Sequence, residues 1–250
     1  MQIQNNRGLR SCQALIWLSL SLLTGVGISP LAMVRPALAQ LSQAPQPRSN
    51  SQSGEMSYEL KGDELRVCRP KANASKPQEQ ECATVGKGYT IVLRTANDLY
   101  AQGNLTNAEK LFRQLISRYP KQPEAYYKLG TIFLEQSQAE DAIAQFRQAI
   151  QLNPEHAKAH NDLGAALASQ GQLDAAVNEW RQAIQINGDY ADALNNLGLA
   201  LLQLGKKEQQ DEAVTSLKKA RELFIKQGRS QPASRIDQLL RDMDKQSSES

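Results

Sequence analysis

The sequence predicts an all-α protein in which helix hairpins of similar sequence stack into a solenoid. Three observations support this class. The 250-residue chain has only 5% aromatic residues and is rich in Ala, Gln and Leu, a composition that favours helix over strand. A set of small and large residues recurs every 34 residues along the chain. Within one period, the apolar residues have the spacing of one helix face.

The overall composition excludes several classes of protein. Apolar residues make up 40% of the chain and charged residues 22%. This balance is polar but able to fold, so it excludes a polytopic membrane protein and a fully disordered chain. The formal net charge is +3, which is too small to indicate nucleic acid as a partner.

The segment 1–39 has the pattern of a secretory signal peptide. Arg7 and Arg10 precede an apolar run at 14–28, and the small residues of the run Ala-Leu-Ala precede Gln40. About fifteen apolar-rich residues span roughly 22 Å as a helix, less than the ~30 Å hydrocarbon core of a bilayer. We therefore expect export to the periplasm or, if the source is photosynthetic, to the thylakoid lumen.

An alternative is that this segment stays attached as an N-terminal membrane anchor, which would then be the contact with the membrane. Residues 31–34 lengthen the apolar run in spite of Pro30. The following residues, 40–57, are rich in Gln, Ser and Pro and contain almost no apolar side chain. Such a composition predicts a disordered linker that acts as a flexible tether.

A small segment at 58–88 contains the two cysteines outside the signal sequence, Cys68 and Cys82. In an exported chain a single pair predicts one disulfide. Closing a loop of about 15 residues stabilises the fold by roughly 3 kcal/mol in the chain-entropy model. The CxxC spacing of redox-active pairs is absent, which argues against a catalytic pair. Apolar residues that alternate around a Gly-Asp turn predict a short hairpin, and they are Tyr58, Leu60, Leu65 and Val67.

The 34-residue period appears in several independent columns of the sequence. A Leu-Gly pair, an alanine, a large aromatic residue, a helix-ending residue and a turn residue each recur once per unit. Columns that agree on one period identify a true internal repeat. The members are Leu129-Gly130, Leu163-Gly164 and Leu197-Gly198; Ala108, Ala142 and Ala176; Phe112, Phe146 and Trp180; Pro120, Pro154 and Gly188; and Gly103, Ser137, Gly171 and Gly205.

Each unit has the apolar pattern of two helices. In the second unit two stripes have helical spacing, and the polar segment 135–138 separates them. Small residues allow the two helices to approach closely, and the bulky aromatic residue fills the space between them. A proline after the second helix ends it and begins the next unit. The stripes are Tyr126, Leu129, Gly130 and Phe133, then Ala142, Ile143, Phe146, Ala149 and Ile150.

These residues resemble the tetratricopeptide repeat (TPR) family. The family pattern is W-x2-L-G-x2-Y, then A-x3-F, then P. The second unit matches it almost column by column with Tyr126-x2-Leu129-Gly130-x2-Phe133, Ala142-x3-Phe146 and Pro154. The resemblance assigns four repeats that together span over half of the chain, at 89–122, 123–156, 157–190 and 191–227.

Departures from the pattern predict the ends of the array. The first unit has Thr95-Ala96 in place of Leu-Gly, as expected of a terminal repeat. In the fourth unit the alanine column lies late, so a lengthened charged turn is expected at 206–210. An apolar stripe that ends at Met243 predicts a capping helix at 231–244. Residues 245–250 are Ser-rich, and a disordered tail is expected there.

The resemblance implies where a partner binds. In TPR proteins the first helices of successive units line a concave groove that binds extended peptides or partner helices. Asn side chains can donate to and accept from a peptide backbone, and Tyr side chains offer flat apolar contact with a polar tip. The candidate groove residues are Arg94, Asn97, Tyr100, Tyr127, Lys128, Thr131, Glu135, Lys158, Asn161, Asp162, Ser169, Asp192, Asn195, Asn196 and Gln203.

One TPR subclass clamps the C-terminal carboxylate of its partner with a set of cationic and Asn side chains. Asn97 and Lys158 match that set, but Leu93 and Asp162 stand where the subclass has Lys and Arg. These departures argue against a carboxylate clamp of that type.

No constellation in the sequence indicates an enzyme, a metal site or a cofactor. The chain has only two histidines, and a disulfide between the mature cysteines leaves no free thiol as nucleophile. His156 and His160 have the spacing of metal ligands on a helix, but His160 falls in a column of large core residues. The sequence therefore predicts a non-enzymatic scaffold that binds a protein or peptide partner and helps assemble an envelope or membrane complex. The alternative is a structural subunit that uses its convex and end surfaces in a stable complex.

Overall fold

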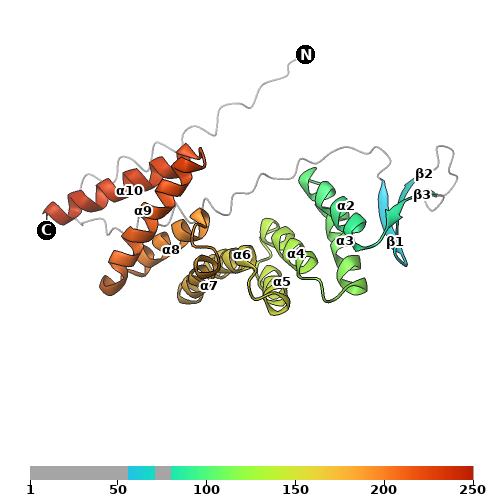
Figure 1. The fold of residues 1–250 in the computed structure, drawn as a ribbon, viewed down its shortest axis with the longest axis horizontal. Coiled ribbons are helices and arrows are strands. Elements are labelled where there is room, and N and C mark those ends of the chain that lie inside the picture. Colours follow the sequence, from blue (N-terminus) through green and yellow to red (C-terminus); the bar gives the residue numbers. More distant parts are fainter. Residues whose placement is uncertain (1–55, 71–79, 250) are drawn as a thin grey trace, which may run out of the picture.

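The computed structural model describes residues 56–70 and 80–249. The signal sequence or anchor expected at 1–39, and the expected linker up to residue 55, lie outside the described residues. Figure 1 shows the described chain as an elongated array of helices with a small sheet at its N-terminal end. Within this part of the chain, no helix is both long and apolar enough to cross a bilayer.

The predicted all-helical solenoid of hairpins is confirmed. In each unit a first helix packs on a second helix, and each second helix also packs on the first helix of the next unit. The units therefore bury each other's apolar faces. The pairs are α2 (Tyr89–Ala101) with α3 (Leu105–Arg118), α4 (Pro123–Glu135) with α5 (Ala139–Leu152), α6 (Ala157–Ser169) with α7 (Leu173–Ile186), and α8 (Ala191–Leu204) with α9 (Gln210–Lys226).

The Leu-Gly column places a glycine where the two helices of a hairpin come closest. A Cβ atom at Gly130 would lie 2.7 Å from Phe146 Cε1, and a Cβ atom at Gly164 would lie 2.7 Å from Trp180 Nε1. Both aromatic side chains are fully buried. The backbone of the first helix therefore rests directly on the ring of the second helix, and there is no room for a methyl group between them.

We predict that Gly164→Ala destabilises the protein. Alanine has the higher helix propensity by about 1 kcal/mol, but the added methyl group would press on the buried Trp180 ring, and such overpacking costs typically about 1–3 kcal/mol. The loss should appear as a lower urea midpoint in denaturation followed by circular dichroism. Gly188→Ala is the matched control, because a Cβ atom there would have no neighbour closer than 3.9 Å. Equal effects of the two substitutions would contradict this packing argument.

The turn between the two helices of each unit contains a residue with left-handed backbone. Gly103, Gly171 and Gly205 have φ angles of 77°, 76° and 65°. In the second unit Ser137 takes the same place with a φ angle of 62°, and no other non-glycine residue of the described chain has a positive φ angle. The column of turn residues in the sequence follows from this requirement, because glycine adopts the conformation most easily.

Ser137→Gly is expected to stabilise the second hairpin. The left-handed region costs a side chain roughly 1–2 kcal/mol, and the greater freedom of glycine in the unfolded chain offsets about 0.5–1 kcal/mol of the gain. Chemical denaturation should therefore show a net increase of about 0.5–1 kcal/mol in the free energy of unfolding. Gly171→Ser is the reverse change in the third unit and should lower stability. A loss of stability in Ser137→Gly would disprove the explanation.

The fourth unit differs from the others in its connection. The lengthened turn contains a short 3₁₀ helix, η2 (Lys207–Gln209), directly before α9. The glycine of this unit, Gly198, faces Leu217 of α9, whose Cγ would lie 2.6 Å from an added Cβ atom. The insertion therefore changes the turn and leaves the close packing of the hairpin intact.

The C-terminal helix α10 (Ser230–Glu249) packs on α9 and covers the apolar edge of the fourth unit. Ala233 and Ile236 are buried there against Phe224. The sequence predicts this helix at 231–244 and a disordered tail at 245–250, and the tail prediction is wrong because the helix continues to Glu249. No glycine or proline follows Pro232, so nothing in the segment ends a helix that packing has started.

The N-terminal segment forms an antiparallel sheet in the order β1-β2-β3. The expected hairpin consists of β1 (Ser57–Lys61), whose first residue had been assigned to the linker, and β2 (Glu64–Pro70). The third strand, β3 (Gln80–Lys87), is absent from the sequence prediction because its residues do not alternate between apolar and polar. It forms nonetheless, because it pairs with β2 through main-chain hydrogen bonds, which need no such pattern.

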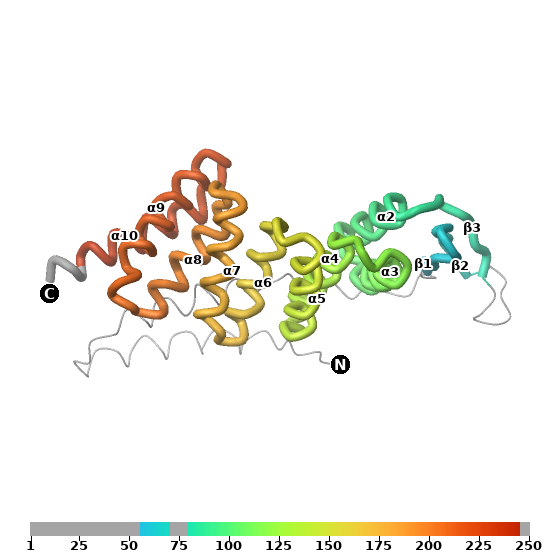
Figure 2. Tube along the Cα trace, turned by 60° about the horizontal axis from the view of Figure 1, so that its bottom comes forward, coloured from blue at the N-terminus to red at the C-terminus, as the bar shows by residue number. Residues whose placement is uncertain are grey.

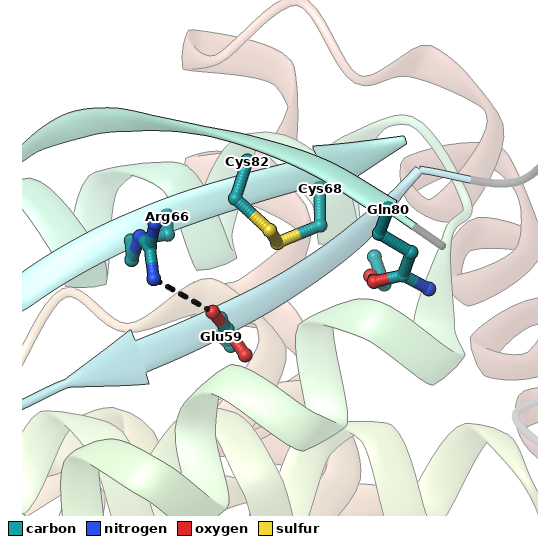
Figure 3. Close-up of a disulfide and its surroundings, with 6 residues drawn as sticks. Glu59, Arg66, Cys68, Gln80 and Cys82 are labelled. Atoms are coloured by element: carbon teal, nitrogen blue, oxygen red, sulfur yellow. Dashed lines mark hydrogen bonds and ion pairs between the residues drawn. A yellow bond between two sulfur atoms is a disulfide. The ribbon is translucent and has the colours of Figure 1, made fainter. Parts of the chain in front are cut away.

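The predicted disulfide is present and joins β2 to β3. Cys68 and Cys82 lie directly opposite each other in the sheet (Figure 3). The neighbouring Glu59 forms an ion pair of 3.5 Å with Arg66 on the same sheet. Glu59 and the two cysteines lie within 4.8 Å of one another, but both sulfur atoms are bonded to each other, so no thiolate is available for a metal.

The sheet covers the N-terminal end of the helical array (Figure 2). Leu65 is buried in the main apolar core. Asp63, in the β1-β2 turn, accepts hydrogen bonds from Arg118 Nε at 3.0 Å and from Tyr119 Oη at 2.7 Å. The solenoid is therefore capped at one end by this sheet and at the other end by α10, as its exposed ends require.

Candidate functional site

The first helices of successive units lie side by side along the array. α4 contacts α6, and α6 contacts α8. Their outer side chains therefore form one surface that crosses several repeats. We call this surface the first-helix face and define it by the candidate groove residues that remain exposed or partly exposed, which are Arg94, Asn97, Tyr100, Lys128, Thr131, Glu135, Lys158, Asp162, Ser169, Asp192, Asn195 and Gln203.

Three of the candidate groove residues are buried instead. Tyr127, Asn161 and Asn196 are only 8%, 6% and 5% exposed. Helical spacing places them outside the stripe that packs on the second helix of the unit, but it carries no information on the first helix of the next unit. The structure packs them at that boundary, so they join neighbouring first helices rather than project toward a partner.

A chain of hydrogen bonds links three first helices through these residues. Tyr127 Oη of α4 donates to Asp162 Oδ2 of α6 at 3.0 Å. Asn161 Nδ2 donates to the other carboxylate oxygen at 2.8 Å, and Asn196 Nδ2 of α8 donates to Asn161 Oδ1 at 3.3 Å. Asn195 extends the chain by donating from Nδ2 to Asn196 Oδ1 at 3.4 Å. The network fixes the positions of these side chains in the free protein.

Asp162 is the charged member of this network. Burial raises the pKa of its carboxyl, and the hydrogen bonds from Asn161 and Tyr127 counteract part of that rise. Among the residues that the structure describes, no Lys, Arg or His nitrogen lies within ion-pair distance of the carboxylate. A carboxylate that is mostly removed from water without a counter-ion destabilises a fold unless another interaction compensates.

A second contact between a tyrosine and a carboxylate joins α2 to α4. Tyr100 Oη donates a hydrogen bond to Glu135 Oε1. Burial raises the pKa of the Tyr100 hydroxyl, and the hydrogen bond to Glu135 raises it further. The phenol therefore keeps its proton and remains a hydrogen-bond donor at physiological pH.

Asp192 is paired with a residue that the sequence does not single out. Arg229, in the turn before α10, donates from Nη1 and Nη2 to the two carboxylate oxygens of Asp192 at 3.0 and 2.8 Å. Its guanidinium also lies 4.4 Å from the centre of the Phe224 ring. Arg229 lies outside the four repeats, in the turn that follows α9, where its N–H donates to the carbonyl oxygen of Phe224 at 2.8 Å.

Two further residues at the edge of this face are missing from the sequence prediction. His156 and Tyr190 occupy equivalent places just before α6 and α8. The His156 ring lies 4.7 Å from the Tyr127 ring between centres. Burial raises the pKa of Tyr190, and the charges of Asp162 and Asp192 raise it further, which places this phenol near both carboxylates. The repeat register, which aligns these two positions, is the signal that could have identified them.

The remaining members of the first-helix face differ in the exposure and the hydrogen bonding of their side chains. Arg94, Lys158 and Ser169 are exposed. The side-chain oxygens of Asn97 and Gln203 are buried and accept no hydrogen bond from any described residue. The face therefore combines exposed polar groups with amides and carboxylates that the fold holds in place.

His160, which the sequence assigns to the core, is buried between two hydrogen-bond acceptors. Its Nδ1 lies 2.7 Å from Glu179 Oε2, and its Nε2 lies 3.0 Å from the carbonyl oxygen of Pro154. Neutral imidazole has one N–H and can satisfy only one acceptor, whereas imidazolium donates to both. The hydrogen bond to Glu179 raises the pKa of His160 against the opposing effect of burial. The ring joins α6 to α7 and to the turn after α5, and in its protonated form it donates to both acceptors.

We predict that the contribution of His160 to stability depends on pH. Its pKa is higher in the folded protein, so the contribution is complete below the unfolded value of about 6.5 and is lost as pH rises through the folded value. The difference in free energy of unfolding between wild type and His160→Gln should be largest near about pH 5.5 and smallest near about pH 9. Glu179→Gln is the control and should remove most of this dependence. A difference that grows with rising pH would contradict the assignment.

Comparison with known families agrees with the repeat pattern. Tetratricopeptide repeat models match residues 93–145 and 191–223, and a TPR repeat model matches residues 130–171 and 166–205. These matches cover 93–223 without a gap, which is more than half of the chain. The chain belongs to the tetratricopeptide repeat family.

Solved structures with a similar fold include other TPR proteins. MamA is 28% identical to this TPR protein with a TM-score of 0.51, and the match covers 56% of this chain and 81% of MamA. YrrB, described as a TPR protein with an unusual peptide-binding site, is 22% identical with a TM-score of 0.48 over 63% of this chain and 75% of its own. A mutant O-GlcNAc transferase of Thermobaculum terrenum is also 22% identical, with a TM-score of 0.48, over 55% of this chain and 26% of the transferase. Among curated proteins there is no significant match.

Proposed function

We propose that this TPR protein is a non-enzymatic interaction scaffold that binds an extended peptide or a helix of a protein partner on its first-helix face. The observation that carries the proposal is the hydrogen-bonded chain from Tyr127 through Asp162 and Asn161 to Asn196. It fixes polar groups of three consecutive first helices in the free protein. A partner therefore loses less binding free energy to the ordering of this surface.

Family membership supports the non-enzymatic part of the proposal. TPR repeats serve as protein–protein interaction scaffolds and are generally not catalytic. The similarity to MamA agrees with the solenoid architecture that this role requires. The carboxylates of Glu135, Asp162 and Asp192 on the first-helix face accept hydrogen bonds from Tyr100, Tyr127 and Arg229, which suits a surface that holds a partner in place.

Export to an oxidising compartment is the second part of the proposal. The disulfide between Cys68 and Cys82 supports it, because such bonds persist outside the reducing cytosol. We place the protein in the periplasm, or in the thylakoid lumen of a photosynthetic source, where it helps assemble an envelope or membrane complex. An exported scaffold is available to the exposed parts of membrane proteins.

Crosslinking in the protein's own cells, followed by identification of the neighbours, tests the binding surface. The test variant combines Lys158→Ala with Asn195→Ala on α6 and α8. The matched control combines Arg147→Ala with Gln182→Ala, which are exposed on the second helices α5 and α7. We expect the test variant to recover its specific neighbours about tenfold less than wild type, as removal of central contacts does at other interfaces.

The control variant separates this proposal from the alternative role as a structural subunit. Neighbours that the control loses and the test variant retains would place the interface on the second helices, and the first-helix proposal would then be wrong. Tyr127 is left unchanged in both variants, because its ring packs in the core and its loss would disturb the fold.

A further inference from the structure

We propose that Asp162 selects the partner by binding the side chain of a lysine or arginine in the bound segment. The inference rests on the proposed function, because it names the chemistry of the segment that the first-helix face binds. It follows from the unused capacity of this carboxylate, from the residues at the same position in neighbouring repeats, and from a cation that the chain itself places on this face.

The Asp162 carboxylate is held in place but not saturated. A carboxylate offers about four acceptor sites, and one site on each oxygen is used, by Tyr127 Oη at 3.0 Å and by Asn161 Nδ2 at 2.8 Å. Both donors are neutral, so they orient the group without cancelling its charge. The residue retains some exposure. A cationic group from outside can therefore reach lone pairs that already point in fixed directions.

Residues 56–70 and 80–249 supply no counter-ion within ion-pair distance of Asp162. Lys158 lies one turn earlier on α6, at a spacing from which it could pair with Asp162. Its charge instead acts on Glu124 and helps to lower the pKa of that carboxyl, to which the hydrogen bond from His156 contributes most. His156 acts on Asp162 only from beyond ion-pair distance. The negative charge of Asp162 is therefore left for another molecule to neutralise.

The repeat architecture does not require a carboxylate at this position. The equivalent residues are Lys128 in the second unit and Asn196 in the fourth. Asn196 sits at the same boundary between first helices and forms its hydrogen bonds with a neutral amide. A neutral residue can therefore fill the structural role, and an unpaired charge there lowers stability. Local costs of this kind are typical of functional positions.

The next repeat shows what a guanidinium does on this face. Asp192 lies near Asp162 and binds both terminal nitrogens of Arg229 at 3.0 and 2.8 Å. The same guanidinium lies over the Phe224 ring. One carboxylate of the face is thus paired with an arginine, whereas the neighbouring carboxylate, Asp162, has no arginine partner in the described part of the chain.

Three tyrosine hydroxyls respond to the charge of Asp162. Burial contributes most to the raised pKa of the Tyr127, Tyr190 and Tyr100 hydroxyls, and the Asp162 charge raises each of them further. These phenols stay protonated and add no negative charge of their own. The Tyr127 ring, which packs in the core, already attracts a cation of this chain, because Lys128 Nζ lies 5.4 Å from its centre. An acidic segment would instead be repelled by Asp162 and Glu135.

Peptide display on the full-length chain tests the proposal. A random decapeptide library on phage is selected on wild type, on Asp162→Asn and on Asp141→Asn. Asp141 is exposed at the start of α5, so its substitution makes the same change in net charge away from the first-helix face. We expect one peptide position to be enriched in Lys or Arg with wild type and with Asp141→Asn. The enrichment should disappear with Asp162→Asn.

A second measurement does not depend on the folding of a variant. A fluorescein-labelled peptide selected by wild type, and the same peptide with its Lys or Arg replaced by Gln, are titrated with the wild-type protein. We expect the dissociation constant to rise about tenfold or more, as for loss of a charge-assisted hydrogen bond. With Asp162→Asn the two peptides should bind equally, which completes a double-mutant cycle.

The outcomes separate this inference from the function on which it rests. Selected peptides without an enriched Lys or Arg, or a Gln-substituted peptide that binds wild type as tightly as the original, would overturn the role of Asp162 while peptide binding itself stands. Selection of no peptide by any of the three proteins would overturn the proposed function and this inference together.

Discussion

The contact between a glycine of the first helix and a large side chain of the second is the constraint on which the structure depends. The helix backbones approach closely only because Gly130 and Gly164 have no Cβ atom to meet Phe146 and Trp180. The second, third and fourth hairpins share this close approach, and their first helices α4, α6 and α8 lie side by side. Trp180 also donates from Nε1 to the carbonyl oxygen of Asn161 at 3.0 Å, which connects the hairpin core to the polar network.

The hydrogen-bond network places polar side chains at the boundary between neighbouring first helices. Apolar contacts alone would suffice to stack the repeats, yet buried Asn and Asp side chains meet between α4, α6 and α8. Each amide has a partner, so its burial costs little, and the hydrogen bonds fix the register of the first helices. Asp162 is the exception, because its charge has no ion-pair partner among the described residues. In the role that we propose for Asp162, stability and recognition make opposite demands on this residue.

The two ends of the array are closed by different means. At the C-terminal end, α10 covers the fourth repeat with an apolar stripe, and Arg229 ties its start to Asp192. At the N-terminal end, a small sheet with few apolar residues of its own covers the first repeat, and the disulfide holds β2 to β3. A cap of this composition has little core to stabilise it, so a covalent link contributes more there than in the helical array.

The sequence by itself determined the features that depend on residues close together in the chain. The helix pairs, the turns with Ser137 in the glycine column, and the β1-β2 hairpin all follow from local spacing, whereas the left-handed backbone of those turns came from the structure. The disulfide also followed, since only two cysteines lie outside the predicted signal segment. The sequence did not reveal the full length of α10, because its Ser-rich end has no apolar stripe. The helix starts where it packs on α9 and continues through that end to Glu249.

Only the tertiary structure decided which candidate residues remain on the surface and which are buried between helices. Tyr127 and Asn196 turn toward neighbouring first helices, and Arg229 reaches Asp192, through contacts between residues separated by 35 to 37 positions. The repeat period fixes where each helix lies in the chain, but not how far the next first helix rotates toward it. That rotation is set by side-chain packing at the unit boundary, and among the described residues it leaves Asp162 hydrogen-bonded to Tyr127 and Asn161 without an ion-pair partner.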